Sequence, residues 1–234
     1  MNRITRKELK RDVFAQEVGH TVEYVERHRR QFILYGSIAL AVVLLAAGYY
    51  YYSKNQRAAR QRELTAAMRV LDAAVGPASP RPTVLSFPTQ EARTSAVNKA
   101  FTDLATQHKG TREGQMARYF LGTVAADQGK LDEAEKSLVE AAQGGDDNYS
   151  SVAKLALAQV LRAKGKTAEA EKLLRGLMAE PTAMVSKEQA TIALAQLLAA
   201  SKPEEARKLL EPLRTQPGAV SRVALTALGS IPKK

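Results

Sequence analysis

Cysteine and tryptophan are both absent from the 234-residue chain. Without cysteine there can be no disulfide, no thiolate metal site, no cysteine nucleophile and no lipid-modified cysteine anchor. Alanine and leucine dominate the apolar residues instead, and this balance favours helices over sheets. The composition therefore predicts an all-α protein.

The chain also has no run of lysine and arginine, although its formal net charge is +11. The excess is spread along the sequence, with +3 on residues 1–31, +5 on 53–110, −1 on 111–180 and +4 on 181–234. Positive charge next to a membrane suits anionic lipid or an acidic partner protein better than a nucleic acid. We therefore expect no nucleic-acid partner.

Motifs that carry chemistry are missing as well. The sequence contains no GxxxxGK[ST], GxGxxG or GxSxG pattern. His20 and His28 lie among arginines, and we expect His108 to be a solvated helix end. The adjacent carboxylates Asp132-Glu133 and Asp146-Asp147 lie in predicted turns, whereas an acid/base dyad needs an enclosed site. We expect neither an enzyme nor a bound metal or cofactor.

One long uncharged stretch is present from Phe32 to Tyr52, FILYGSIALAVVLLAAGYYYY. A helix of these 21 residues is about 30 Å long, which matches the hydrocarbon core of a bilayer. The stretch follows 31 residues and exceeds the roughly 7–15 apolar residues of a signal peptide. We therefore expect a retained transmembrane helix at 32–52 that contacts membrane lipid and has tyrosines at its interfaces.

The preceding segment, residues 1–31, is a charged tail. Apolar residues recur within 5–30 near helical spacing and predict an amphipathic helix. These residues are Leu9, Val13, Val18, Val22 and Val25. Such a helix can lie on lipid headgroups, meet a partner helix, or be solvated without a specific role.

Residues 53–110 form a membrane-proximal region. An apolar stripe predicts a helix over 53–75 that can continue directly from the span, and a second helix is expected over 91–108. The stripe consists of Leu64, Met68, Leu71 and Val75. Residues 76–90 hold four of the nine prolines and should form a surface loop or a flexible connection.

From residue 111 the chain repeats with a period of 36 residues. The repeating positions are Leu121, Leu157 and Ala193; Gly129, Gly165 and Ser201; Ala134, Ala170 and Ala206; Leu138, Leu174 and Leu210. The third unit has lost one residue near its turn, so Leu194 aligns better with Leu157 than Ala193 does.

Each unit fits a helix hairpin. The turn glycines suit positive φ, the alanines suit close helix crossings, and the leucines fill the layer between units. Ser186 and Gln189 suit a capping box, and Pro203 suits the first turn of a helix. Stacked hairpins bury apolar faces that one hairpin cannot, which predicts a right-handed α-solenoid over 111–215.

Residues 216–234 should close the open end of this stack with a short helix and a fraying tail. The residues expected to cover the last hairpin are Val220, Val223, Leu225 and Leu228.

The repeat resembles the tetratricopeptide repeat. Leu121-Gly122, Gly129, Ala134 and Leu138 match that family's pattern, with Ala158 in place of the glycine in the second unit. The third unit lacks the turn glycine. The resemblance implies an all-α solenoid of helix hairpins that binds other proteins.

The whole arrangement also resembles the bacterial family of ancillary subunits of the SecYEG translocon. The stretch AFTDLATQHKGTREGQMARYFLGTVAADQGKLDEAEKSLVEAA is similar to that family's first repeat region, although the tail here is longer. The resemblance implies a single-pass protein of the inner membrane with a cytoplasmic tail and a periplasmic repeat domain. Its partners would be translocon subunits, periplasmic chaperones or exported chains. Long domains translocate largely regardless of charge, which is compatible with this orientation.

The concave face of such a solenoid is the expected partner-binding surface. By alignment with the repeat family, its inward-facing residues are Tyr119, Thr123, Asp127, Gln159, Arg162 and Gln196. These polar groups can bind an extended or helical peptide, or they can be ordinary exposed helix residues.

Two functions follow from this organisation. The first is a single-pass, membrane-anchored adaptor that binds proteins at the outer face of the cytoplasmic membrane, in protein export or chaperone recruitment. The alternative is a self-associating scaffold, a homo-oligomer, for an envelope or cell-division assembly.

Overall fold

The computed structural model describes residues 29–76 and 85–232 and shows an all-α protein with one very short sheet. The chain divides between Ala58 and Ala59 into two compact units. The amphipathic helix expected at 5–30 lies almost entirely outside the described residues. The elements in chain order are α2 (Arg29–Leu71), β1 (Ala74–Val75), β2 (Ser86–Phe87), α3 (Gln90–Gln107), α4 (Arg112–Asp127), α5 (Leu131–Ala142), α6 (Asp147–Ala163), α7 (Thr167–Ala179), α8 (Lys187–Leu198), α9 (Pro203–Leu210), the 3-10 turn η1 (Glu211–Leu213) and α10 (Ala219–Ser230).

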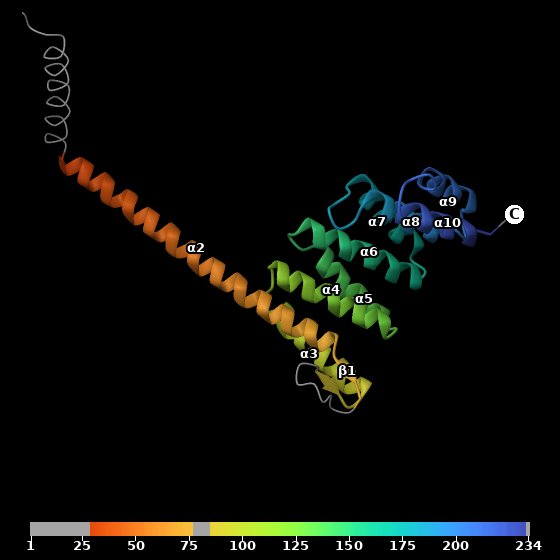
Figure 1. The fold of residues 1–234 in the computed structure, drawn as a ribbon, viewed down its shortest axis with the longest axis horizontal. Helices are drawn as coiled ribbons and strands as arrows, with labels where there is room; N and C mark the ends of the chain where they lie inside the picture. Colours follow the sequence, from red (N-terminus) through yellow and green to blue (C-terminus); the bar gives the residue numbers. More distant parts are fainter. Residues whose placement is uncertain (1–28, 77–84, 233–234) are drawn as a thin grey trace, which may run out of the picture. The chain divides into compact units, whose positions relative to one another are not determined.

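The expected span at 32–52 lies within α2, one uninterrupted helix of 43 residues (Figure 1). Its most apolar window has a mean hydropathy of 2.1 and is not buried by any described part of the protein. Among the described residues, α2 is the one helix long and apolar enough to cross a bilayer. A helix of this kind near an N-terminus serves as a membrane anchor or as a signal sequence.

The last turns of α2 pack into a small core with α3 and α4. Phe101 of α3 is completely buried there and stacks on Phe120 of α4, with 5.1 Å between ring centroids. From α2, Ala67 is buried, and three residues of the predicted stripe pack beside it. Those three are Leu64, Met68 and Leu71.

The fourth member of that stripe, Val75, lies elsewhere than expected. It is 44% exposed, because α2 ends at Leu71 and Val75 belongs to β1. Strand β1 pairs in parallel with β2, where Ala74 N donates to Leu85 O at 3.0 Å. Since both strands are two residues long, they join the ends of the predicted proline-rich loop without adding a layer to the domain.

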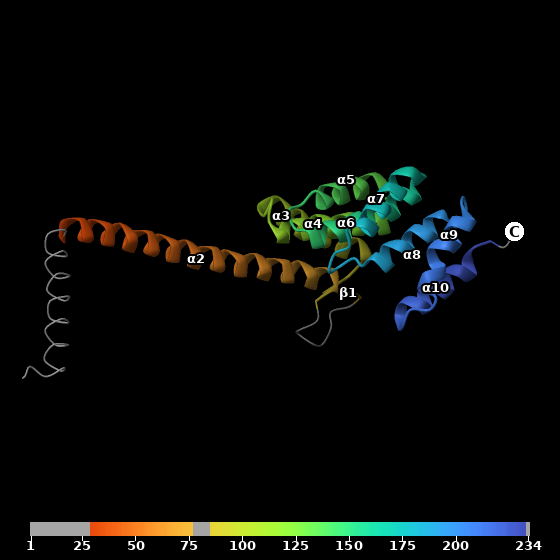
Figure 2. The ribbon, with the colours of Figure 1, turned by 90° about the horizontal axis from the view of Figure 1, so that it is seen from above.

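The predicted helix hairpins are present as α4–α5, α6–α7 and α8–α9. Each helix from α3 to α9 packs against its neighbours in the chain, so the pairs form one stack (Figures 1 and 2). The described core of this stack contains the alanines and leucines that repeat every 36 residues. Ala134, Ala170 and Ala206 are each 0% exposed, and Leu138, Leu174 and Leu210 are at most 3% exposed.

The turn and crossing positions explain why small residues recur. Gly129 and Gly165 end their turns with φ of 75° and 77°, the left-handed region that glycine tolerates. A Cβ at Gly122 would lie 2.5 Å from Leu138 Cγ, so α4 and α5 can approach this closely only with glycine at that position. In the third pair, Ser186 Oγ accepts from Gln189 N, and Pro203 begins α9.

Helix α10 closes the stack, but not through all the expected residues. Ala224 and Ala227 are its buried side chains, whereas Val223 and Leu225 are 46% and 51% exposed. The small alanines face α8 and α9 because a short helix at the end of a stack must approach closely to cover it. The two larger side chains therefore point away from the stack, and the expectation for them was wrong.

Ion pairs between neighbouring hairpins repeat with the same 36-residue period. Glu135 of α5 accepts from Lys166 at 2.6 Å, and 36 residues later Glu171 of α7 accepts from Lys202 at 3.2 Å. Lys164 also contacts Glu135, at 2.5 Å, and Arg175 donates to Glu171 at 2.7 Å. Glu135 and Glu171 thus each bind a lysine in the turn of the next hairpin.

These ion pairs predict that the protein is less stable in acid. Hydrogen bonds from Lys164 and Lys166 lower the pKa of Glu135, and those from Arg175 and Lys202 lower the pKa of Glu171. Because the folded-state pKa lies below the ordinary value of 4.5, the stabilisation is complete above that pH and is lost as the pH falls through the folded-state pKa.

Replacing both residues, Glu135→Gln with Glu171→Gln, should lower the free energy of unfolding at pH 7 by about 0.5–1 kcal/mol for each residue, because each pair remains partly exposed to water. It should also flatten the pH dependence, as measured by urea unfolding of the full chain in detergent. The exposed Glu204→Gln is the matched control. An unchanged pH dependence in the double variant would contradict a role for these pairs.

Candidate partner-binding site

Two shallow hollows bring five of the six expected binding residues together on the first helices of the hairpins. Thr123 and Asp127 of α4 line a hollow of about 210 Å³ together with Gln159 of α6. Gln159 also lines the next hollow, of about 40 Å³, with Arg162 of α6 and Gln196 of α8. We call this surface the first-helix face, defined by those five residues.

The first-helix face consists mainly of exposed polar side chains that lie above buried apolar ones. Asp127, Gln159, Arg162 and Gln196 are exposed, and the buried leucines of the hairpins lie beneath them. Thr123 differs, because its hydroxyl donates to Phe120 O at 3.0 Å within the same helix. Amide, carboxylate and guanidinium groups in this arrangement can hydrogen-bond a peptide backbone as well as side chains.

Tyr119, the sixth expected residue, does not line either hollow. It is half-buried and meets Phe120 edge-on, with 5.2 Å between ring centroids. Burial raises the pKa of its hydroxyl, so the group stays neutral at physiological pH. Its ring packs against the core of the stack, which gives it a structural contact that spacing along the helix did not reveal.

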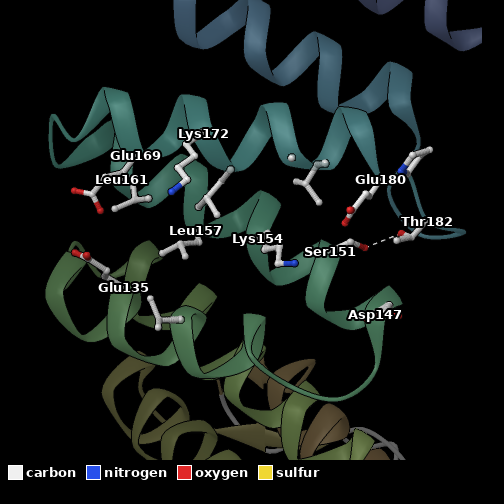
Figure 3. A pocket seen from close by; sticks show the side chains of 15 residues that line it. Glu135, Asp147, Ser151, Lys154, Leu157, Leu161, Glu169, Lys172, Glu180 and Thr182 are labelled. Carbon is white, nitrogen blue, oxygen red and sulfur yellow. Dashed lines mark hydrogen bonds between the residues drawn. The ribbon is translucent and has the colours of Figure 1, made fainter.

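A larger concavity lies elsewhere on the stack, and none of the six expected binding residues lines it. It is a groove of about 670 Å³ that has α5 on one side, α7 on the other and α6 as its floor (Figure 3). Its apolar surface comes from α5, α6 and α7, and its edges are charged. The apolar members are Val139, Leu157, Leu161, Leu173 and Leu177, and the charged members are Glu135, Asp147, Lys154, Glu169, Lys172 and Glu180. We call it the α5–α7 groove.

The sequence holds one signal that could have indicated the α5–α7 groove. Gly176 is in the last turn of α7, before the helix ends at Ala179, and it lines the groove. A glycine inside a helix weakens that helix relative to alanine, so its presence there calls for a reason. The position 36 residues earlier is Glu140, so this glycine also departs from the repeat.

The described residues contain no group of three or more histidine, aspartate or glutamate side chains that could hold a metal ion. His108 is not the solvated helix end that we expected. Its Nε2 lies 2.6 Å from Glu63 Oε2, so it links the end of α3 to the last turns of α2.

Comparison with known protein families identifies one match. A family model described as a tetratricopeptide repeat-like domain matches residues 30–209, which include the apolar helix and all three hairpins. No curated protein and no solved structure matches the chain. Families of this kind are typically non-catalytic, and no enzyme family is among the matches.

Proposed function

This chain belongs to the tetratricopeptide repeat-like domain family, and we propose that it is a membrane-anchored adaptor that binds partner proteins through the first-helix face. The observation that carries the proposal is that Gln159 is shared by two neighbouring hollows on successive hairpins. A continuous polar surface over several hairpins suits a segment of another protein lying across them.

The apolar helix is the part of the chain that would hold the repeats at the membrane. An anchor at 32–52 would restrict the repeats to a thin layer beside the bilayer and raise the effective concentration of a weakly binding surface. The length of α2 supports an anchor, as does its most apolar window, which has a mean hydropathy of 2.1 and is not buried by any described part of the protein.

The partners that we propose follow from the family resemblance of the whole chain. A tail of 31 residues, one span and a repeat domain are arranged as in the ancillary subunits of the SecYEG translocon. We therefore place the repeat domain at the outer face of the bacterial cytoplasmic membrane. Its partners there would be translocon subunits, periplasmic chaperones or exported chains.

A triple variant of the first-helix face tests the adaptor function. Gln159→Ala, Arg162→Ala and Gln196→Ala together should lower the yield of crosslinked partner proteins by about fivefold or more, because central contacts carry most of the binding energy. The measurement is crosslinking in cells, purification through a C-terminal tag, and quantitative mass spectrometry. All three side chains are exposed, so the fold should remain intact.

The matched control changes exposed lysines on second helices, Lys136→Ala in α5 with Lys208→Ala in α9, and should retain wild-type yields. Equal partner yields from the triple variant and the control would contradict binding at the first-helix face. Recovery of further copies of this chain alone would favour the self-associating scaffold instead.

A further inference from the structure

Gly176 leaves the α7 side of the α5–α7 groove without a side chain in the last turn of the helix. A Cβ built at this position would meet no atom within 4 Å, so the packing of the described residues does not require a glycine there. The backbone is helical and does not need positive φ either. The missing side chain therefore exposes the α7 backbone to whatever enters the groove.

Charged side chains are ordered along the groove. Glu169 lies at one end, and Glu180 and Asp147 lie at the other, with Lys154 and Lys172 between them (Figure 3). The carboxylates at the two ends attract positive charge, whereas the lysines in the middle attract negative charge.

The remaining charged member, Glu135, is already occupied by this chain. Its carboxylate binds Lys164 and Lys166, at 2.5 and 2.6 Å. It therefore adds little to the charge pattern that an incoming molecule meets. Glu169 is the acidic group available at that end of the groove.

The floor between these charges is apolar. Leu157 and Leu161 of α6 line it, and Val139 and Leu173 are half-buried on the two sides. The groove follows α7 from Glu169 to Glu180, a distance of about 16 Å, or three helical turns. A helix that lays one apolar face into a groove between two other helices matches this length and shape.

We propose that the α5–α7 groove is a second docking surface, separate from the first-helix face, for an amphipathic helix of another protein. The helix has about three turns, an apolar face, basic residues at both ends and an acidic residue at its centre. The backbone of α7 at Gly176 gives it room to approach closely. An adaptor with both surfaces holds two partners at once.

The probe is a fluorescein-labelled peptide of about three helical turns, with leucines every three to four residues, lysines at both ends and glutamates in the middle. A second probe has the lysines and glutamates exchanged. Both are titrated against the full chain in phosphatidylcholine nanodiscs, with empty nanodiscs subtracted, and fluorescence anisotropy reports binding. The first probe should bind the wild type at least about tenfold more tightly than the exchanged one, because the order of charges differs.

Two variants at one position then locate the binding. Gly176→Phe places a ring in the groove from an exposed helical position and should weaken the first probe by about tenfold or more. Gly176→Ala adds a single methyl group where the docked helix approaches the α7 backbone, so it should weaken the first probe, but less than phenylalanine does. Lys172→Glu should reduce the preference for the first probe over the exchanged one.

Equal affinity of the wild type and Gly176→Phe for the first probe would overturn the proposal. So would binding of a fluorescent fatty acid that Gly176→Phe abolishes while neither peptide binds, since the groove would then hold a lipid chain. The triple variant of the first-helix face should bind the probe as the wild type does. Failure of this proposal can thus be told apart from failure of the adaptor function.

Discussion

Replacing Phe101 by alanine is expected to destabilise the α2–α3–α4 core by about 3–5 kcal/mol. The side chain is completely buried and stacks on Phe120, so alanine leaves a large cavity between helices that cannot easily collapse. In a stack of hairpins each unit is stabilised by its neighbours, so the damage should stay near α3. Hydrogen exchange should become faster in α3 and at the end of α2, while α8 keeps its protection.

Val223→Ala is the matched control for this truncation. Val223 is 46% exposed on α10, so its replacement should change the free energy of unfolding by less than about 0.5 kcal/mol. If exchange rose equally in α3 and α8, the repeats would unfold as one unit, and the local core would not have the role that we assign to it.

Deleting residues 32–52 is expected to move the protein from the membrane fraction to the soluble fraction almost completely. The deletion removes the uncharged stretch, and no other described helix is long and apolar enough to replace it. With the wild-type chain, protease added to spheroplasts should remove a C-terminal tag, because the proposed orientation places the repeats outside. With the deletion, the tag should stay protected until the cells are lysed.

The conservative variant Val42→Leu keeps the stretch apolar and should behave as the wild type. Protection of the tag in intact wild-type spheroplasts would reverse the orientation and remove the basis for the translocon partners. Release of a shortened soluble chain from the spheroplasts would identify the apolar helix as a signal sequence.

The six residues expected to bind a partner show how much a repeat pattern can predict. Alignment with the repeat family selected them, and five of the six do line neighbouring hollows on α4, α6 and α8. The pattern could not distinguish Tyr119 from its neighbours, because its burial depends on Phe120 and on the core behind both rings. Whether the five bind a partner is still a prediction.

Helix α10 and the α5–α7 groove show where pattern reasoning stops. Val223 and Leu225 look like packing residues by their type, yet Ala224 and Ala227 occupy the contact with the last hairpin. Which face of a short helix is buried depends on how closely it approaches its neighbours. The groove likewise depends on how far apart α5 and α7 lie over α6, and nothing within a single helix encodes that distance.

The apolar helix, the three hairpins and their 36-residue period can all be derived from spacing along the chain. They depend on local rules: the length of an uncharged run, the positive φ of Gly129 and Gly165, and the small residues at helix crossings. Other features arise only when the helices pack against one another. These are the ion pairs of Glu135 and Glu171 with the next hairpin, the burial of Tyr119 and the open space at Gly176. Each of these depends on distances between side chains far apart in sequence, which periodicity does not contain.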